Sequence, residues 1–504
     1  MLRVVDWESR HRIGQLTVSH LRYELDDTVR VVEVLFEIVT MIDRSRDSGV
    51  ILDELSHLSL KYKHIGPVKE ASDAMLIAGF EPFMKVIIDY CTTGSTASDV
   101  FDEIFMKRIH AESPVEGLRS CPSNLKPFSS HIIRSGRNAS LSRSLGHSPG
   151  DRIALNTIQV IEDEYTAANF FNECVSKTST ALYHAVDSRS PIEPAIRWFC
   201  EYLLITKSDW FSLFVAKSMS ELEKPIKLVD RSYLNELLQI LPNSPSCEMH
   251  AFQIEDMFGP GGDIRTLAEI QNEELESSSL PAIKALTLNP NIQFPLSLVF
   301  TESTLFKFQT VFRILSYSRI VSMKLSQVWL EFQSFKSIGD GCVLFSANIL
   351  LKRMMHLVDN FLFHLNVDVV ATNLRNLDLT GSPDIDKVRE SIESVIESIL
   401  AGCCISPACV RSVNKILGTC SLFASHMTKF AKMHASSGEE ELIIRTSQDE
   451  QYIGLIAKFE DAFDGQVNSL LVQLKHHVSA DRARAQALVA IIDYNDYYSD
   501  KIGL

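Results

Sequence analysis

The stretch from Phe294 to Trp329 constrains the fold most strongly, because it has the pattern of one long helix. Pro295 stands just ahead of the pattern, and no Gly or Pro follows it up to Trp329, so nothing inside the run breaks a helix. One face carries residues spaced three and four apart, namely Leu305, Phe308, Phe312, Leu315, Arg319 and Met323. This spacing predicts a helix that packs against other helices, since an isolated amphipathic helix gains little stability in water.

Length, composition and charge limit the class of protein. The 504 residues allow roughly three domains at about 150 residues each. Hydrophobic residues make up 45% and charged residues 22%, which excludes a chain that is disordered throughout. The formal net charge of −15 disfavours nucleic acid and anionic membrane surfaces as partners, because both need basic protein surfaces. Neither a secretory signal nor a stretch of about 20 apolar residues is present, so we expect a cytosolic chain.

The sequence carries no convincing catalytic or metal-binding motif. The densest group of the ten cysteines, Cys403, Cys404, Cys409 and Cys420, lacks paired C-x-x-C spacing, so we interpret these residues as buried, reduced thiols. No phosphate loop, HEXXH or nucleophile-elbow motif occurs. His356 and Asp359 have i, i+3 spacing, which indicates a structural or interface contact along a helix. We therefore expect a non-catalytic scaffold or binding protein without cofactor or metal.

The coarse pattern predicts an all-α fold, an elongated stack of helical bundles in two halves. Helical stripes with short Pro-capped turns are typical of bundles, and at Ser382-Pro383 we expect Ser382 to be the N-cap and Pro383 the first helical residue. The predicted parts are a bundle over residues 1–110, a Ser-rich disordered loop or insertion over 111–151, a second bundle over 152–241, a linker over 242–284 and a C-terminal helical domain over 285–504.

Several segments resemble one known family. Arg319 to Trp329 is similar to the end of a family helix, and Lys352 to Val369 is similar to a helix with an aromatic-rich end. The ending Asp493-Tyr494-Asn495-Asp496-Tyr497-Tyr498 resembles the family's closing Asp-Tyr/Phe-Asn-x-Tyr-Tyr. Weaker matches are Lys63–Val68, Phe101–Met106, Tyr202–Phe211 and Lys458–Phe463. On these segments the chain resembles the gamma-tubulin complex component family, and within it the core-only component-four type.

The resemblance implies both the partners and a candidate contact site. It implies that the C-terminal half binds gamma-tubulin, that the N-terminal half contacts neighbouring components, and that the assembly templates microtubule nucleation at a microtubule organising centre such as the centrosome or spindle pole. We expect the gamma-tubulin contact among exposed polar residues of the second half, namely Arg313, Arg319, Lys352, Arg353, His356, Asp359 and Asn360.

Two alternatives fit the helical composition as well. The chain could be another all-helical scaffold, such as a tethering-complex subunit, although no constant repeat of 30–47 residues is present in the sequence. It could also be a helical-bundle enzyme, which would require a deep pocket with convergent polar side chains.

Overall fold

The chain divides into two compact units in the computed structural model. The first unit comprises Met1–Ser190 and Ser382–Asp386, and the second comprises Pro191–Gly381 and Lys387–Leu504. The structure describes residues 2–45, 47–99, 104–106, 117–147, 164–225, 228–243, 281–284, 286–290, 292–334, 342–377, 384–403, 407–436, 442–475 and 482–502. Most of the predicted linker at 242–284, the pair Ser382-Pro383, Cys404 and residues 101–103 lie outside these ranges.

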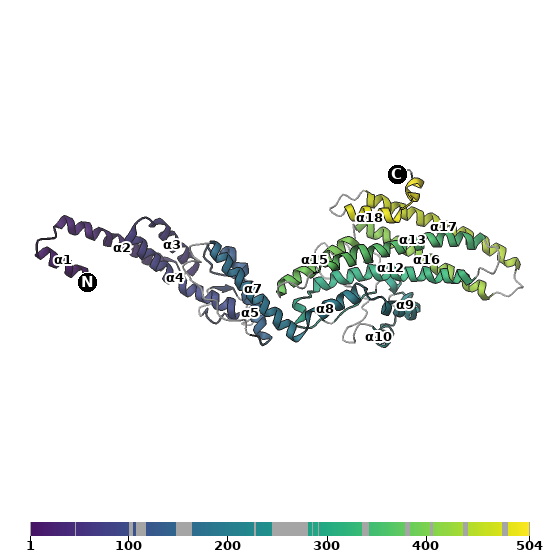
Figure 1. The fold of residues 1–504 in the computed structure, drawn as a ribbon, viewed down its shortest axis with the longest axis horizontal. Helices are drawn as coiled ribbons and strands as arrows, with labels where there is room; N and C mark the ends of the chain where they lie inside the picture. Colours follow the sequence, from purple (N-terminus) through teal and green to yellow (C-terminus); the bar gives the residue numbers. More distant parts are fainter. Residues whose placement is uncertain are drawn as a thin grey trace. The chain divides into compact units, whose positions relative to one another are not determined.

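Helices dominate both units, which confirms the all-α prediction (Figure 1). The first unit contains α1 (Leu2–Arg12), α2 (Val18–Arg44), α3 (Ser48–Lys61), α4 (Gly66–Thr93), η1 (Lys126–Phe128), α5 (Ser129–Ser144) and α7 (Glu164–Arg189). A short antiparallel ladder joins β1 (Phe105–Met106) to β2 (Gly117–Leu118). The sequence analysis placed residues 152–241 in one bundle, whereas the division into units falls at Ser190.

The second unit contains a longer series of helices. They are α8 (Ile192–Trp198), η2 (Phe199–Leu203), α9 (Asp209–Leu222), α10 (Arg231–Ile240), η4 (Ala282–Lys284), η5 (Leu296–Leu298), α12 (Glu302–Ser334), α13 (Cys342–Phe363), η7 (His364–Ala371), α14 (Thr372–Arg375), α15 (Ile385–Cys403), α16 (Pro407–Ser436), α17 (Leu442–Lys475), α18 (Arg482–Ile492) and α19 (Tyr497–Ile502). Of these, η2 and η7 are π-helices. The first two residues of α15, Ile385 and Asp386, belong to the first unit.

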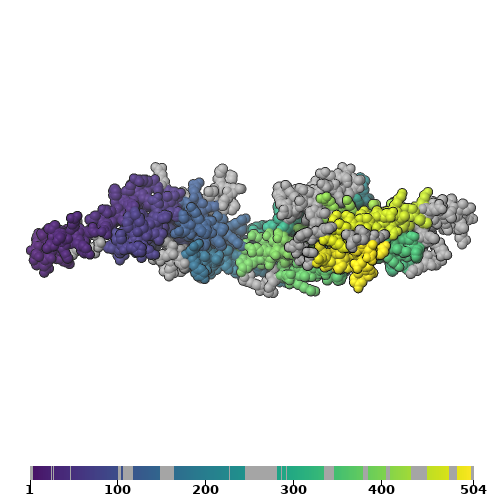
Figure 2. Space-filling view, turned by 90° about the horizontal axis from the view of Figure 1, so that it is seen from above, coloured from purple at the N-terminus to yellow at the C-terminus, as the bar shows by residue number. Residues whose placement is uncertain are grey.

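Four long helices form the core of the second unit. Helix α12 packs against α13 and α16, and α17 packs against α13 and α16, so the four run side by side (Figure 1). Phe308, Phe312 and Leu315 of α12 are buried, as their spacing predicted. Phe199 of η2 stacks on Phe300 ahead of α12, with ring centroids 4.1 Å apart. The last helices, in yellow, lie at the surface of this unit (Figure 2).

The prediction of a disordered loop over residues 111–151 is wrong for residues 129–144, which form helix α5. The helix packs between α4 and α7. Its buried face includes the small residues Ser135, Gly136, Ala139 and Ser142 beside Ile132 and Asn138. At Gly136 an added Cβ would lie 2.1 Å from the Tyr90 ring, so only glycine permits this approach. Two of the serines that suggested a loop, Ser135 and Ser142, therefore belong to a close-packing surface.

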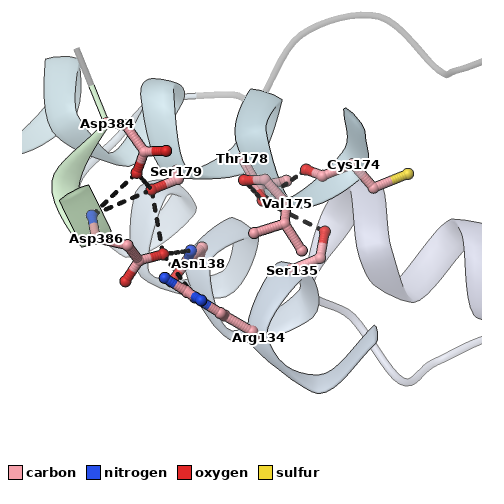
Figure 3. A network of polar contacts seen from close by, with 9 residues as sticks. All are labelled: Arg134, Ser135, Asn138, Cys174, Val175, Thr178, Ser179, Asp384 and Asp386. Atoms are coloured by element: carbon pink, nitrogen blue, oxygen red, sulfur yellow. Dashed lines mark hydrogen bonds and ion pairs between the residues drawn. The ribbon is translucent and has the colours of Figure 1, made fainter. Parts of the chain in front are cut away.

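The start of α15 also differs from expectation. The Oδ1 atom of Asp384 accepts a hydrogen bond from the Asp386 backbone N–H at 3.0 Å (Figure 3). An aspartate side chain that accepts from the N–H two residues on is a helix cap. Asp384 therefore caps α15, in the role that the sequence analysis gave to Ser382.

Candidate interaction surfaces

Helix α13 has one buried and one exposed face. Leu350, Met354, Leu357, Val358 and Phe361 are buried within the second unit. The opposite side, which we call the α13 face, consists of Phe345, Ile349, Lys352, His356, Asp359 and Phe363 of α13 and of Val367 in η7. Steps of three and four residues place these side chains on one stripe of the helix. Phe345 is 71% exposed and Phe363 is 54% exposed, so large apolar groups reach solvent at both ends of the face.

The centre of the α13 face is polar. The Nε2 atom of His356 lies 3.0 Å from Nδ2 of Asn360, one turn further on. Ser322 of α12 donates from its hydroxyl to Oδ1 of Asp359 over 2.7 Å. The expected His356–Asp359 pair is therefore replaced by contacts of each residue with a different neighbour. These bonds hold the polar side chains in place while leaving His356 and Asp359 exposed.

Arg353 contacts both α17 and the C-terminal tyrosines. Its Nη1 atom donates to Oε1 of Glu460 at 2.8 Å, and its Nη2 atom pairs with Asp464, so α13 is tied to α17. Its guanidinium carbon also lies 5.2 Å and 5.6 Å from the ring centroids of Tyr497 and Tyr498. Burial alone would lower the pKa of Arg353, but the hydrogen bond with Tyr498 and the charge of Asp464 carry the pKa above its ordinary value. The side chain thus secures the C-terminal residues against α13.

Two further predicted residues lie on α12 and contribute little surface. Arg313 is only 6% exposed, and burial lowers its pKa to about 10. Arg319 is half-buried, and burial lowers its pKa against the opposing effect of Asp209. Of the seven predicted residues, the structure therefore brings Lys352, His356 and Asp359 together on an exposed face, with Asn360 half-buried beside them.

The sequence analysis did not predict the apolar members of the α13 face. Phe363 lies within Lys352 to Val369, which resembles the family's helix with an aromatic-rich end, and Phe345 and Ile349 precede that segment. Their signal is periodic, because they fall at three- and four-residue steps from Lys352 and His356, which had been selected as exposed. Apolar residues in register with a polar face indicate a surface that can be covered by a partner.

The C-terminal turn is held by a carboxylate. Asp493 is 6% exposed, and its side chain accepts from the backbone N–H groups of Tyr498 at 2.9 Å and Ser499 at 3.1 Å. Its Oδ2 also accepts from the Ser499 hydroxyl. These bonds cap α19 and leave Tyr494 on the outside, 80% exposed. The Asp-Tyr-Asn-x-Tyr-Tyr ending thus contains a structural aspartate and an exposed tyrosine.

Helix α2 of the first unit has two apolar faces. Val34, Ile38 and Met41 are buried. The other side, which we call the α2 face, is formed by Leu25, Val29, Val32, Phe36 and Val39. Phe36 is 73% exposed. A surface helix with four exposed apolar residues and the half-buried Leu25 at heptad-like spacing resembles half of a helix–helix contact.

The described part of the chain contains no group of three or more His, Cys, Asp and Glu residues arranged to hold a metal. Cys403, Cys409 and Cys420 are buried thiols. No helix within the described ranges is both long and apolar enough to span a membrane.

The helical fold and its two exposed faces are typical of a scaffold that binds other proteins. The family profile described as Gamma tubulin complex component C-terminal matches residues 195–498. This chain therefore belongs to the gamma-tubulin complex component family, a structural family without known catalysis.

Individual relatives agree with the family assignment. The chain is 20% identical to Gamma-tubulin complex component 2 of Mus musculus over 468 residues, covering 86% of this chain and 51% of that protein. It is 26% identical to Gamma-tubulin complex component 4 of Mus musculus over 243 residues, or 47% of this chain and 34% of that protein. It is 19% identical to Spindle pole body component alp4 of Schizosaccharomyces pombe, covering 65% of this chain and 49% of that protein. The chain spans about half the length of the first two component 2 relatives it matches.

Proposed function

We propose that this chain is a non-catalytic structural subunit of the gamma-tubulin complex. Its C-terminal half, residues 285–504, binds gamma-tubulin, and its N-terminal half contacts neighbouring components, so that the assembly templates microtubule nucleation. Holding several gamma-tubulin molecules in one scaffold reduces the entropy cost of bringing them together. Family membership supports this role, and the exposed α13 face is the observation that carries it.

The α13 face has the composition of a protein-binding surface. Apolar and aromatic side chains at its ends are groups that a partner would shield from water, and aromatic anchors dominate many interfaces. Lys352, His356, Asp359 and Asn360 supply polar contacts that fix orientation. Arg313 and Arg319 lie in α12 and Arg353 ties α13 to α17, and we assign these three residues a supporting role in the same contact.

Replacing Phe363 by aspartate tests the proposed contact. A buried charge in place of an aromatic anchor should weaken gamma-tubulin binding by about 30-fold or more, in line with the loss of an interface hot spot. The matched control is Leu422→Asp, because Leu422 of α16 is also exposed, at 60%. Calorimetry or pull-down with the full chain gives the readout. Equal binding by F363D and the unchanged chain would rule out this face.

The α2 face is our candidate for the contact with a neighbouring component. Its exposed valines and Phe36 need an apolar partner surface, and Glu33 lies in α2 among these residues, whereas Asp26 pairs with Arg30 at 2.8 Å. We therefore expect a partner helix with an apolar stripe and basic residues beside it, as in paired helices whose flanking charges choose the partner.

We further propose the component-four type and a location at the microtubule organising centre. The identity of 26% to Gamma-tubulin complex component 4, against 20% over a longer span to component 2, supports the type. Relatives named as spindle pole body components support the location. Co-purification with the partners identified by mass spectrometry distinguishes the two component types.

A further inference from the structure

The first unit contains a pocket of about 560 Å³ between α2, α3 and α4. Its wall is mainly apolar, with Ile38 and Ile42 from α2, Leu52 and Leu55 from α3, and a longer contribution from α4. The pocket is separate from the α2 face, whose five residues are not part of this wall. A pocket of this size and composition is typical of sites that hold small molecules by apolar contact and a few polar groups.

Helix α4 supplies the longest part of the wall. Met75, Ala78, Gly79 and Pro82 line the pocket at steps of three and four residues, so one face of the helix is turned towards it. At Gly79 an added Cβ would lie 3.2 Å from Cδ2 of Leu52, so α3 and α4 approach each other closely there. The small side chains of Ala78 and Gly79 leave space that larger residues would fill.

Pro82 creates a hydrogen-bond acceptor in this wall. It stands inside α4, which continues on both sides of it. Proline has no backbone N–H, so the carbonyl of Ala78, four residues earlier, lacks the donor that an α-helix normally supplies. Because Ala78 and Pro82 both line the pocket, this gap in the helical hydrogen bonds is on the pocket side of α4. The wall therefore offers a backbone carbonyl to a molecule inside.

The polar side chains of the wall are bonded to other parts of the protein. The Ser98 hydroxyl donates to a carboxylate of α4 at 3.0 Å, and Ser48 Oγ lies 2.9 Å from Ser120 Oγ. Asp99 accepts from the backbone N–H groups at the start of β1. The polar contact of a bound molecule then falls to the Ala78 carbonyl. A carbonyl only accepts hydrogen bonds, so the bound molecule must supply the donor.

We propose that this pocket binds a small, mainly apolar molecule that carries one uncharged hydrogen-bond donor such as a hydroxyl. The apolar body packs against α2, α3 and α4, and the donor bonds to the carbonyl of Ala78. The donor is uncharged because an apolar wall disfavours the burial of a charge. This site adds small-molecule binding to the scaffold and does not depend on the proposed gamma-tubulin contact.

Fluorescence titration of the full chain with β-naphthol tests the proposal, and the methyl ether of β-naphthol is the comparison because it has the same rings without a donor. β-Naphthol should bind saturably at one site per chain. In Pro82→Ala the restored N–H donates to the Ala78 carbonyl and takes the place of the ligand hydroxyl. The affinity for β-naphthol relative to its methyl ether should therefore fall by about fivefold, the effect of one neutral hydrogen bond. A change of pocket shape alone would alter both affinities alike.

Ala78→Trp tests the place of binding. Ala78 is exposed, so an indole can enter the pocket without displacing a core residue. Both probes should bind about tenfold more weakly or worse, because the new ring overlaps the space for the ligand. Ala74→Trp is the matched control, since Ala74 is exposed on the same helix but does not line the pocket. This variant should keep both affinities.

Three results would overturn the proposal. They are the lack of saturable β-naphthol binding, equal binding by Ala78→Trp and the unchanged chain, and an unchanged ratio of the two affinities in Pro82→Ala. If Ala78→Trp fails to fold, Pro82→Ala decides alone, because alanine is a better helix former than proline.

Discussion

Arg353 and Lys352 are neighbours in the sequence but have opposite surroundings. Lys352 is exposed on the α13 face, whereas Arg353 is directed towards Glu460, Asp464 and the tyrosines of the C-terminal turn. Its planar guanidinium can pair with carboxylates through two nitrogens and stack on aromatic rings at the same time, which a lysine ammonium cannot do. The C-terminal turn is therefore secured by one residue of α13.

Replacing Arg353 by methionine should destabilise the second unit by about 2 kcal/mol or more, because Asp464 is buried and loses the cation that faces it. Lys352→Met changes the adjacent exposed residue and should alter the free energy of unfolding by less than about 0.5 kcal/mol. Urea unfolding measured by circular dichroism compares the two variants. Equal midpoints for R353M and K352M would contradict the packing role.

At the scale of elements, α5 shows why composition misleads. Serine and glycine are frequent in loops, but here their small size allows α5 to approach α4 and α7 closely. The buried Ser135 hydroxyl donates to the Cys91 carbonyl of α4, and the Ser142 hydroxyl donates to the His147 carbonyl just after α5. A segment that is weakly helical by propensity becomes a helix because its neighbours supply the packing and the bonds.

Gly136→Ala should destabilise the first unit by about 1–3 kcal/mol, because the new methyl group would overlap the buried Tyr90 ring. Ser140→Ala on the exposed side of the same helix should be neutral or slightly stabilising. Thermal unfolding and exchange of the α5 amides give the measurement. If the two variants have the same melting temperature, α5 does not pack on Tyr90 as described.

The sequence predicts the long helices well and their partners poorly. The spacing of Phe308, Phe312 and Leu315 identified the buried side of α12, since periodicity is a local property. The burial of Arg313 and the hydrogen bond to Asp384 from Ser179, 205 positions away, depend on residues distant in the chain. Within the candidate site, the polar residues at the centre of the α13 face were predicted. The exposure of Phe345 and Phe363 could not be predicted, because it depends on which helices pack against α13.

At the scale of the whole molecule, the two exposed apolar faces belong to different units. The α2 face lies in the first unit and the α13 face in the second, and the family profile matches residues 195–498 of the chain. Each unit has its own packed helices. A substitution on one face should therefore leave the other unit folded, so the two proposed contacts can be removed separately.

This separation predicts the outcome of mixing two variants. Phe36→Asp should abolish binding to the neighbouring component but keep binding to gamma-tubulin, and Phe363→Asp should do the reverse. Leu60→Asp is the control for the first unit, since Leu60 is 66% exposed. A nucleation assay with either variant should give fewer microtubules than the unchanged chain. Mixing F36D with F363D should not restore nucleation, because a template gains from linkage only when both contacts are made by the same molecule. Restoration in the mixture would show that the two contacts act independently, and the scaffold mechanism would then be wrong even if both binding sites were correct.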